Sequence, residues 1–192
     1  MEIREAILSR RSVRAYQDKP IAPQELQEIL EAGMHAPSGV NLQPWYFVAI
    51  QSKEKLDSLK EVMGRVSKAI EPGLKERFSK NPAVVEETTR FVHHMGGAPV
   101  CILAFHFKPD FEDTAGIVSL SIAAAIENML LAATDKGIGS CWLTAPVEAG
   151  VGTELGAAFA PGKGPMVSMI TLGYPVQAAK TPPRKAGRYD IV

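Results

Sequence analysis

The chain has 192 residues, in which 21 lysines and arginines balance 21 aspartates and glutamates. A balanced charge favours neither nucleic acid nor an anionic membrane surface as a partner, so both are excluded as first hypotheses. The length fits one domain, with or without an insertion, that buries a substantial apolar core.

The chain opens with a charged amphipathic segment. Ile3, Ala6 and Ile7 fall on one helical face, which predicts a helix that runs into the basic cluster RRSVR at residues 10–14. This segment contains no apolar stretch typical of a signal peptide. A cytoplasmic protein is therefore expected.

The next segment alternates between helix, loop and strand. Pro23 suits the first turn of a second helix, whose apolar residues repeat at helical spacing until PSG at 37–39 stops them. A loop then runs through Pro44. The aromatic and β-branched run at 45–50 contains no breaker and predicts a central strand, after which Ser52 offers the N-cap of another helix.

Residues 64–95 are more charged than their surroundings and are expected to form a mobile lid. Pro72 and Gly73 are expected to interrupt this segment. Pro82 is expected to lie in the first turn of a helix that ends near Gly96.

The second half of the chain predicts a strand at 100–107, a long helix at 114–136 and a strand at 167–172. Residues 150–156 have glycines near dinucleotide-fingerprint spacing, but no clear strand precedes them, which favours a loop. The tail at 173–192 is rich in proline and basic residues and is expected to wrap over a surface.

The helix at 114–136 is apolar on most sides and is expected to be buried on all of them. Glu127 and Asn128 interrupt it, so it is interpreted as a buried helix and not as a membrane span. Pairing with a second subunit would bury it, and so would a central position within a monomer. Periodicity does not choose between these two interpretations.

The cysteines and histidines suggest no catalytic or metal site. Cys101 and Cys141 are far apart, form no CxxC and have apolar neighbours, which is typical of buried thiols in a reducing compartment. GSCW at 139–142 overlaps the pattern around a papain-like nucleophile, but all four histidines precede Cys141, which is therefore assigned to packing. His93 and His94 would diverge on a helix and have no matching ligand set, so no metal is predicted.

Four segments carry polar groups that suit an anionic, aromatic cofactor. Three guanidiniums and a hydroxyl at 10–14 can surround a phosphate, although basic clusters at helix ends are also commonly solvated. The loop at 37–45 suits a heteroaromatic ring or forms an ordinary turn. The glycines at 137–142 either let backbone N–H groups approach a ligand or form the C-cap of a helix before a strand. The cations at 182–185 either close over a phosphate or are solvated.

The order RRSVR, PSGVNLQPW, GIGSCW and GYP followed by PPRK resembles the nitroreductase family over nearly the whole chain, and least at 64–95. The resemblance implies one α+β domain over residues 1–192 with a three-layer fold, in which helices flank a central mixed, mainly antiparallel sheet. It also implies an intertwined homodimer with FMN at the subunit interface. This favours the subunit-pairing interpretation of the long helix.

The resemblance further implies cofactor-binding residues and no catalytic side chain, because the flavin carries the chemistry. Arg10 and Ser12 would bind the FMN phosphate, and Arg14 would lie near the pyrimidine edge and stabilise the reduced flavin. Ser38 and Asn41 would contact the isoalloxazine from the partner subunit. The full implied set is Arg10, Arg11, Ser12, Arg14, Pro37, Ser38, Gly39, Asn41, Gln43, Ser140, Cys141, Trp142, Arg184 and Lys185.

The implied function is hydride transfer from NADH or NADPH, through FMN, to a small electrophilic acceptor such as a nitroaromatic or a quinone, in a ping-pong cycle. Two alternatives stay open. A specialised relative, such as a reductive dehalogenase resembling iodotyrosine deiodinase or an enzyme that fragments its own flavin, shares RRSVR-like and PSG-like motifs. A non-catalytic flavin-binding or protein-interaction module would keep the fold without turnover.

Overall fold

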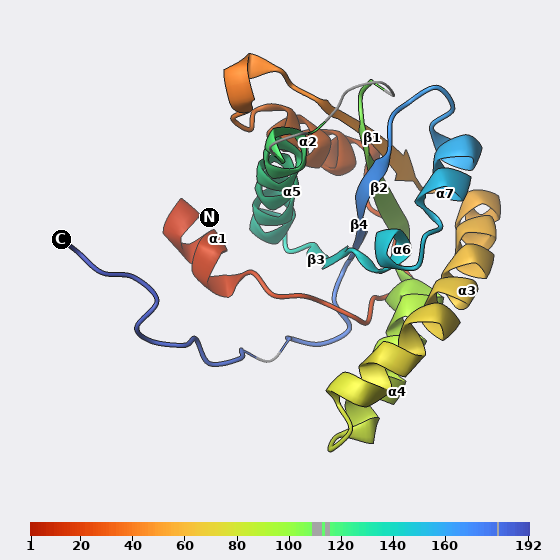
Figure 1. Ribbon diagram of the computed structural model, residues 1–192. Helices are drawn as coiled ribbons and strands as arrows, with labels where there is room; N and C mark the ends of the chain where they lie inside the picture. The colour runs from red at the N-terminus through yellow and green to blue at the C-terminus, as the bar shows by residue number, and fades with distance from the viewer. Residues whose placement is uncertain (109–112, 114–115, 180) are drawn as a thin grey trace.

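A four-stranded antiparallel sheet forms the centre of the computed structural model, which describes residues 1–108, 113, 116–179 and 181–192 (Figure 1). The strands are β1 (Trp45–Ile50), β2 (Val100–His106), β3 (Gly139–Leu143) and β4 (Met166–Gly173), in the order β1-β2-β4-β3. All three strand pairings are antiparallel. A parallel contact is present as an isolated bridge between Ser12 and Ser140, at the edge strand β3.

The strand predictions agree closely with these bounds. The bounds predicted at 45–50 are confirmed, but the expected central position is wrong, because β1 lies at one edge of the four-stranded sheet. The strand predicted at 100–107 ends one residue early, and the one at 167–172 extends by one residue at each end. Hydrophobic runs without a breaker predict such buried strands well, because both faces of a central strand pack against apolar layers.

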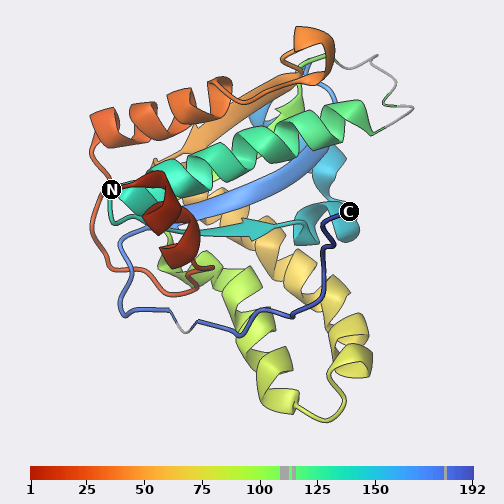
Figure 2. The ribbon, with the colours of Figure 1, turned by 90° about the vertical axis from the view of Figure 1, so that its left-hand side faces the viewer.

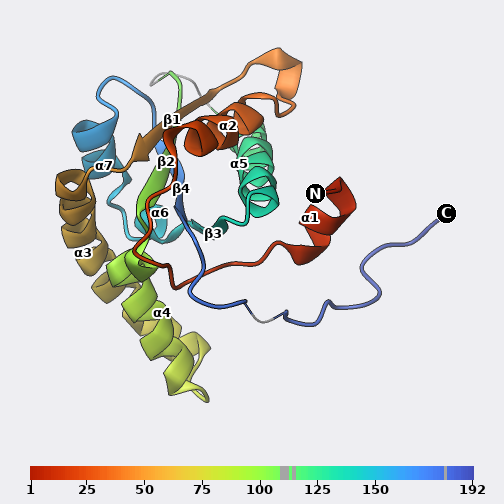
Figure 3. The same cartoon turned by 180° about the vertical axis from the view of Figure 1, so that it is seen from behind.

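Different helices cover the two faces of the sheet, which gives three layers (Figures 1 and 3). α2 (Pro23–Met34) and α5 (Ile117–Asp135) pack on the face that carries Ile102 of β2. α3 (Lys53–Arg77), α6 (Ala145–Glu148) and α7 (Gly152–Phe159) pack on the face that carries Leu103. Neighbouring residues of β2 point to opposite faces, so one strand contributes to both cores. The predicted three-layer α+β fold is confirmed.

α3 and α4 (Pro82–His94) form an antiparallel hairpin that projects from the body, followed by the short helix η2 (Met95–Gly97) (Figures 1 and 2). The predicted N-cap of α3 is confirmed, because Ser52 Oγ accepts a hydrogen bond from the Lys55 N–H at 3.3 Å. The predicted interruption at Pro72 and Gly73 is wrong, because α3 continues through both residues. Apolar packing of the two helices offsets the hydrogen bond that a proline removes. The function of this hairpin as a lid remains a prediction.

α5 begins at Ile117, whereas Thr114, where the predicted helix starts, lies outside the described residues. Among the described helices, α5 has the length and composition to cross a membrane, yet 44% of that window is buried inside the fold. The expected burial on all sides is wrong for a single chain, since Leu120 is 69% exposed and Ile117 is 46% exposed. One apolar stripe of α5 therefore faces outward.

The glycine-rich segment at 150–156 is partly helical, so the predicted loop is corrected there. α7 begins at Gly152, and Leu155 is fully buried in the core. Burial of one apolar side chain stabilises a short helix that glycine disfavours by propensity.

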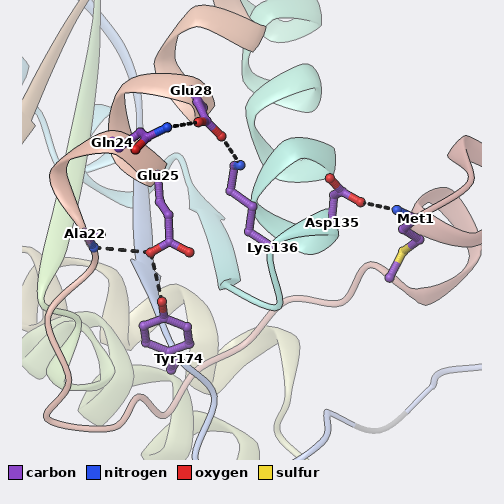
Figure 4. Close-up of polar contacts among 8 residues, drawn as sticks. All are labelled: Met1, Ala22, Gln24, Glu25, Glu28, Asp135, Lys136 and Tyr174. Carbon is purple, nitrogen blue, oxygen red and sulfur yellow. Dashed lines mark hydrogen bonds and ion pairs between the residues drawn. The ribbon is translucent and has the colours of Figure 1, made fainter.

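Polar contacts hold α2 against the end of α5 (Figure 4). Glu28 of α2 accepts a hydrogen bond from Lys136 Nζ, and Glu25 accepts one from Tyr174 Oη at 3.0 Å. Glu25 also accepts a hydrogen bond from the Ala22 N–H at 3.3 Å, at the start of α2. These contacts anchor the first half of α2 to the end of α5 and to the residue that follows β4.

The two ends of the chain lie outside the three layers. α1 (Ile3–Ser9) and the extended residues 181–192 stand apart from the sheet (Figure 3). Ile3, Ile7 and Leu8 of α1 are exposed. Together with the outward stripe of α5, these side chains give one side of the molecule an apolar character.

Candidate functional site

The predicted basic cluster lies at the exit of α1 and lines a cavity. α1 ends at Ser9, as the sequence predicts, and the chain then extends away from the helix. The cavity has a volume of about 540 Å³. Its lining consists of side chains from the first and last segments of the chain, namely Arg10, Arg11, Ser12, Arg14, Thr181, Pro182 and Arg184. The tertiary structure thus brings two of the four predicted segments together.

The guanidiniums of the cluster have different environments. Arg10 Nε lies 3.4 Å from Glu127 Oε1 of α5, so an acidic side chain orients Arg10 without enclosing it. Arg11 Nη1 donates to the Leu8 carbonyl at 2.7 Å, and Arg11 Nη2 donates to Thr181 Oγ1 at 2.9 Å. Arg11 therefore ties the tail to the end of α1.

The third predicted segment borders the same cluster through β3. The Val13 N–H donates to the Ser140 carbonyl at 2.8 Å. This close approach requires glycine at position 139, because a Cβ there would lie 2.7 Å from Val13 Cγ2. Ser140 is 2% exposed, and its Oγ has no hydrogen-bond partner among the described residues. A buried hydroxyl without a partner beside an arginine-lined cavity fits a polar ligand.

Cys141 and Trp142 continue β3 with different roles. Cys141 is buried in the core, as the packing assignment predicts. Burial raises the pKa of the Cys141 thiol, and nearby Arg14 partly opposes this shift, so the thiol is protonated at neutral pH. Trp142 is partly exposed, and its Nε1 donates to Ser168 Oγ, which fixes the indole ring.

Arg14 faces a second, adjoining cavity of about 820 Å³ between residues 12–15 and α4. The Arg14 guanidinium lies 5.7 Å from the centre of the Phe91 ring. Glu87 and Arg90 of α4 also line this cavity. A larger space of mixed charge therefore continues from the arginine cluster towards the α3–α4 hairpin.

The loop at 37–44 is held by its own hydrogen bonds. It contains the short helix η1 (Gly39–Asn41). The Gln43 N–H donates to Ser38 Oγ at 3.0 Å, and Gln43 Nε2 donates to Asn41 Oδ1 at 3.0 Å. Asn41 and Gln43 have φ values of 55° and 47°, a backbone region that non-glycine residues rarely adopt. Such conformations occur preferentially at functional sites.

This loop lies far from the arginine cluster of the same chain (Figure 2). The Gly39 N–H donates to Ser121 Oγ in the first turns of α5, whereas Arg10 contacts Glu127 and α1 lies near the other end. The two α5 residues contacted, Ser121 and Glu127, are six residues apart, which corresponds to about 9 Å along the helix axis. Within one chain, neither cavity that the arginine cluster lines includes the predicted loop residues Pro37, Ser38, Gly39, Asn41 and Gln43.

Arg184 lines the arginine cavity, whereas Lys185 is exposed and does not line it. The structure therefore does not bring Lys185 together with the other predicted residues.

Sequence reasoning missed two contributors to this site. Glu127 was noted only as an interruption of an apolar helix, although an isolated carboxylate there indicates a nearby cation. Thr181 carried no signal, because only the fold brings the tail to Arg11.

The histidine pair differs from the prediction. The His93 and His94 rings do not diverge, since their centres are 4.2 Å apart and the rings are stacked. α4 ends at His94, and the left-handed backbone of Met95 follows, so ideal helical side-chain directions do not apply. In the part of the chain that the structure describes, no three His, Cys, Asp or Glu residues could hold a metal ion together.

The fold and the candidate site define an α+β protein with an arginine-lined cavity beside the middle of α5 and a polar loop of unusual backbone conformation at the start of that helix. A model of the nitroreductase family matches residues 7–174. A protein of Methanothermobacter thermautotrophicus, named provisionally as an NADH dehydrogenase/NAD(P)H nitroreductase, is 29% identical over 178 residues, which cover 92% of this chain and 79% of that protein.

Two solved structures are also similar. A nitroreductase with bound FMN from Bacteroides fragilis is 32% identical with a TM-score of 0.76, over 100% of this chain and 99% of that one. A BluB-like flavoprotein from Clostridium difficile is 25% identical with a TM-score of 0.77, over 96% and 95% of the two chains. The chain belongs to the nitroreductase family, which confirms the prediction from its motifs.

Proposed function

We propose that the protein is an FMN-dependent oxidoreductase that transfers hydride from NADH or NADPH to small electrophilic acceptors such as nitroaromatics or quinones. The observation that carries the proposal is the arginine-lined cavity beside the unpartnered Ser140 hydroxyl. The names of the relatives, which include NAD(P)H and FMN, support the choice of donor and cofactor.

The residues of this cavity fit a phosphate monoester. Arg10 and Arg184 supply guanidiniums, which bind phosphate oxygens through charge-assisted hydrogen bonds, and Ser12 supplies a hydroxyl. Arg14, at the border with the larger cavity, is assigned to the pyrimidine edge of the flavin, where its charge favours the reduced state. Bound FMN supplies the hydride chemistry, and the protein supplies orientation and a restricted space.

We propose further that the active form is a homodimer in which each site contains residues of both chains. The loop at 37–44 contacts the first turns of α5, whereas Arg10 contacts the middle of the helix at Glu127, so an antiparallel, two-fold pairing across α5 would bring the loop of one chain towards the cluster of the other. The apolar side formed by α1 and the stripe of α5 suits such an interface. Ser38, Asn41 and Gln43 would then contact the flavin held by the partner.

The test is a visible spectrum of the purified protein, followed by separate additions of NADH and NADPH without oxygen. The expected result is a flavin absorption band that one or both donors bleach, and that a nitroaromatic or a quinone restores. Restoration after the oxidised nicotinamide has been removed would support a ping-pong cycle. A colourless protein without affinity for FMN would contradict the whole proposal.

A specialised relative is the second candidate, and two observations favour it. The similarity to a BluB-like flavoprotein is as high in TM-score as that to the nitroreductase. The cavity beside Arg14 also carries Glu87 and Arg90, charges that suit a polar substrate better than a plain quinone. A yellow protein that neither NADH nor NADPH bleaches would favour this candidate or a non-catalytic flavin-binding module.

A further inference from the structure

A separate cavity of about 290 Å³ lies at the far end of the sheet from the arginine cluster. The start of β1, the end of β2 and the first turn of α5 enclose it. Met34, Pro44 and Val118 give it apolar walls, whereas Gln43 and Lys108 add polar side chains. This volume is just below the usual range for drug-sized ligands and suits a molecule with a single ring.

Two residues that line this cavity each carry a buried polar atom without a partner. Trp45 and His106 oppose each other in the antiparallel pairing of β1 with β2 and are 3% and 7% exposed. Trp45 Nε1 and His106 Nδ1 accept or donate no hydrogen bond within the part of the chain that the structure describes. Among the described residues, the third buried side-chain atom of this kind is Ser140 Oγ, on the β3 residue that bridges to Ser12 of the arginine cluster. Two of the three atoms therefore belong to residues that line this cavity, and buried polar groups normally have partners.

The two atoms have complementary hydrogen-bond character. The indole N–H of Trp45 only donates. Burial lowers the pKa of the His106 imidazole, an effect that Asp113 partly opposes, so the ring is neutral near pH 7 and one of its nitrogens accepts. Directly opposed residues have Cβ atoms about 5 Å apart, so the two side chains start side by side on one face of the sheet. A hydroxyl oxygen fits, because it accepts from Trp45 and donates to His106.

We propose that this cavity binds a small phenol, with its ring against Met34, Pro44 and Val118 and its hydroxyl between Trp45 and His106. The site lies within one chain and requires neither FMN nor a second subunit. It shares Gln43 with the loop assigned to the partner's flavin, but the hydroxyl contacts depend on Trp45 and His106 alone.

The first test is calorimetric titration of the protein with p-cresol and, in parallel, with toluene, which has the same shape without the hydroxyl. One p-cresol is expected per chain, with toluene binding about tenfold or more weakly. The titration is repeated after FMN has been removed, and the p-cresol affinity is expected to stay the same. Loss of binding with the flavin would place p-cresol on the flavin instead and overturn the proposal.

The second test compares three variants. Trp45→Phe keeps the aromatic ring and removes the N–H, and it is expected to weaken p-cresol binding by about five- to twentyfold while toluene binding stays unchanged. His106→Leu is expected to do the same. Tyr46→Phe, which removes a hydroxyl from the neighbouring residue on the opposite face of β1, is the matched control and should have no effect.

Circular dichroism and the retained toluene affinity show whether each variant is folded. Equal p-cresol affinity in the parent and both folded variants would overturn the proposal. So would the absence of saturable p-cresol binding, which would leave water as the partner of Trp45 and His106. A protein that binds no FMN but still binds p-cresol would contradict the proposed function and not this inference.

Discussion

At the residue scale, Arg10 carries most of the phosphate assignment. It is about one-quarter exposed, and its single ion pair, with Glu127, leaves most of its guanidinium donors available to a ligand. Arg11, by contrast, uses its donors on the Leu8 carbonyl and on Thr181. Two adjacent arginines thus have different functions, which their positions in the sequence do not distinguish.

Arg10→Ala is expected to weaken FMN binding by about 1.5 to 3 kcal/mol, because it removes a charge-assisted hydrogen-bond partner. The measurement is quenching of free flavin fluorescence during titration of the apoprotein. Arg4→Ala removes an exposed arginine of α1 outside the cavity and serves as the control. Unchanged affinity in Arg10→Ala would refute the phosphate assignment of this residue.

His106 is expected to make stability depend on pH. Burial lowers its folded pKa, so the unfolded chain binds a proton that the folded chain resists. The free energy of unfolding should therefore decrease as the pH falls below about 6.5, until the folded imidazole is also protonated. Urea unfolding at neutral and at mildly acidic pH measures this decrease, which His106→Leu should reduce. The same decrease in parent and variant would argue against His106 as its source.

At the scale of elements, α3 contains a proline that its packing accommodates. Pro72 lies inside the helix and cannot donate a backbone hydrogen bond, whereas Pro82 lies in the first turn of α4, where no such bond is needed. The same residue type is therefore costly in one helix and suitable in the other.

Pro72→Ala is expected to raise the free energy of unfolding by about 1 to 3 kcal/mol, although greater freedom of the unfolded chain offsets part of the gain. Pro82→Ala is the matched control and should give no such increase. Urea unfolding followed by circular dichroism measures both. Equal stabilisation by the two substitutions would mean that the position of Pro72 within α3 has no special cost.

At the scale of the whole molecule, the outward stripe of α5 separates the two halves of the proposed site. Leu120, in the first turn of α5, is largely exposed, and α1, which carries the exposed Ile3 and Leu8, packs against α5 near its other end (Figure 2). A helix that is apolar on its exposed side indicates a covered surface. The exposed stripe therefore supports the subunit-pairing interpretation over a central helix within a monomer.

Leu120→Glu is expected to raise the dissociation constant of the proposed dimer about tenfold or more, since it places a charge in an apolar interface. Sedimentation over a concentration series measures the constant. Val147→Glu changes an exposed aliphatic residue of α6 and serves as the control. A parent protein that sediments as a monomer would contradict the dimer, and an unchanged constant in Leu120→Glu would contradict this interface.

The sequence by itself determined the features that depend on near neighbours. The strand at 45–50, the cap at Ser52 and the basic cluster at the exit of the first helix follow from local propensity and from hydrogen bonds over a few residues. The family also follows from the sequence, because its motifs are short segments in a fixed order.

Only the tertiary structure decided which of these segments lie together. Residues 10–14 contact β3, the tail and the middle of α5, while the loop at 37–44 contacts the first turns of α5, because the packing of that helix on the sheet sets their positions. The strand register likewise places Trp45 opposite His106, which no local pattern predicts. Such relations depend on contacts between residues far apart in the chain, and the energy of those contacts is absent from any local segment.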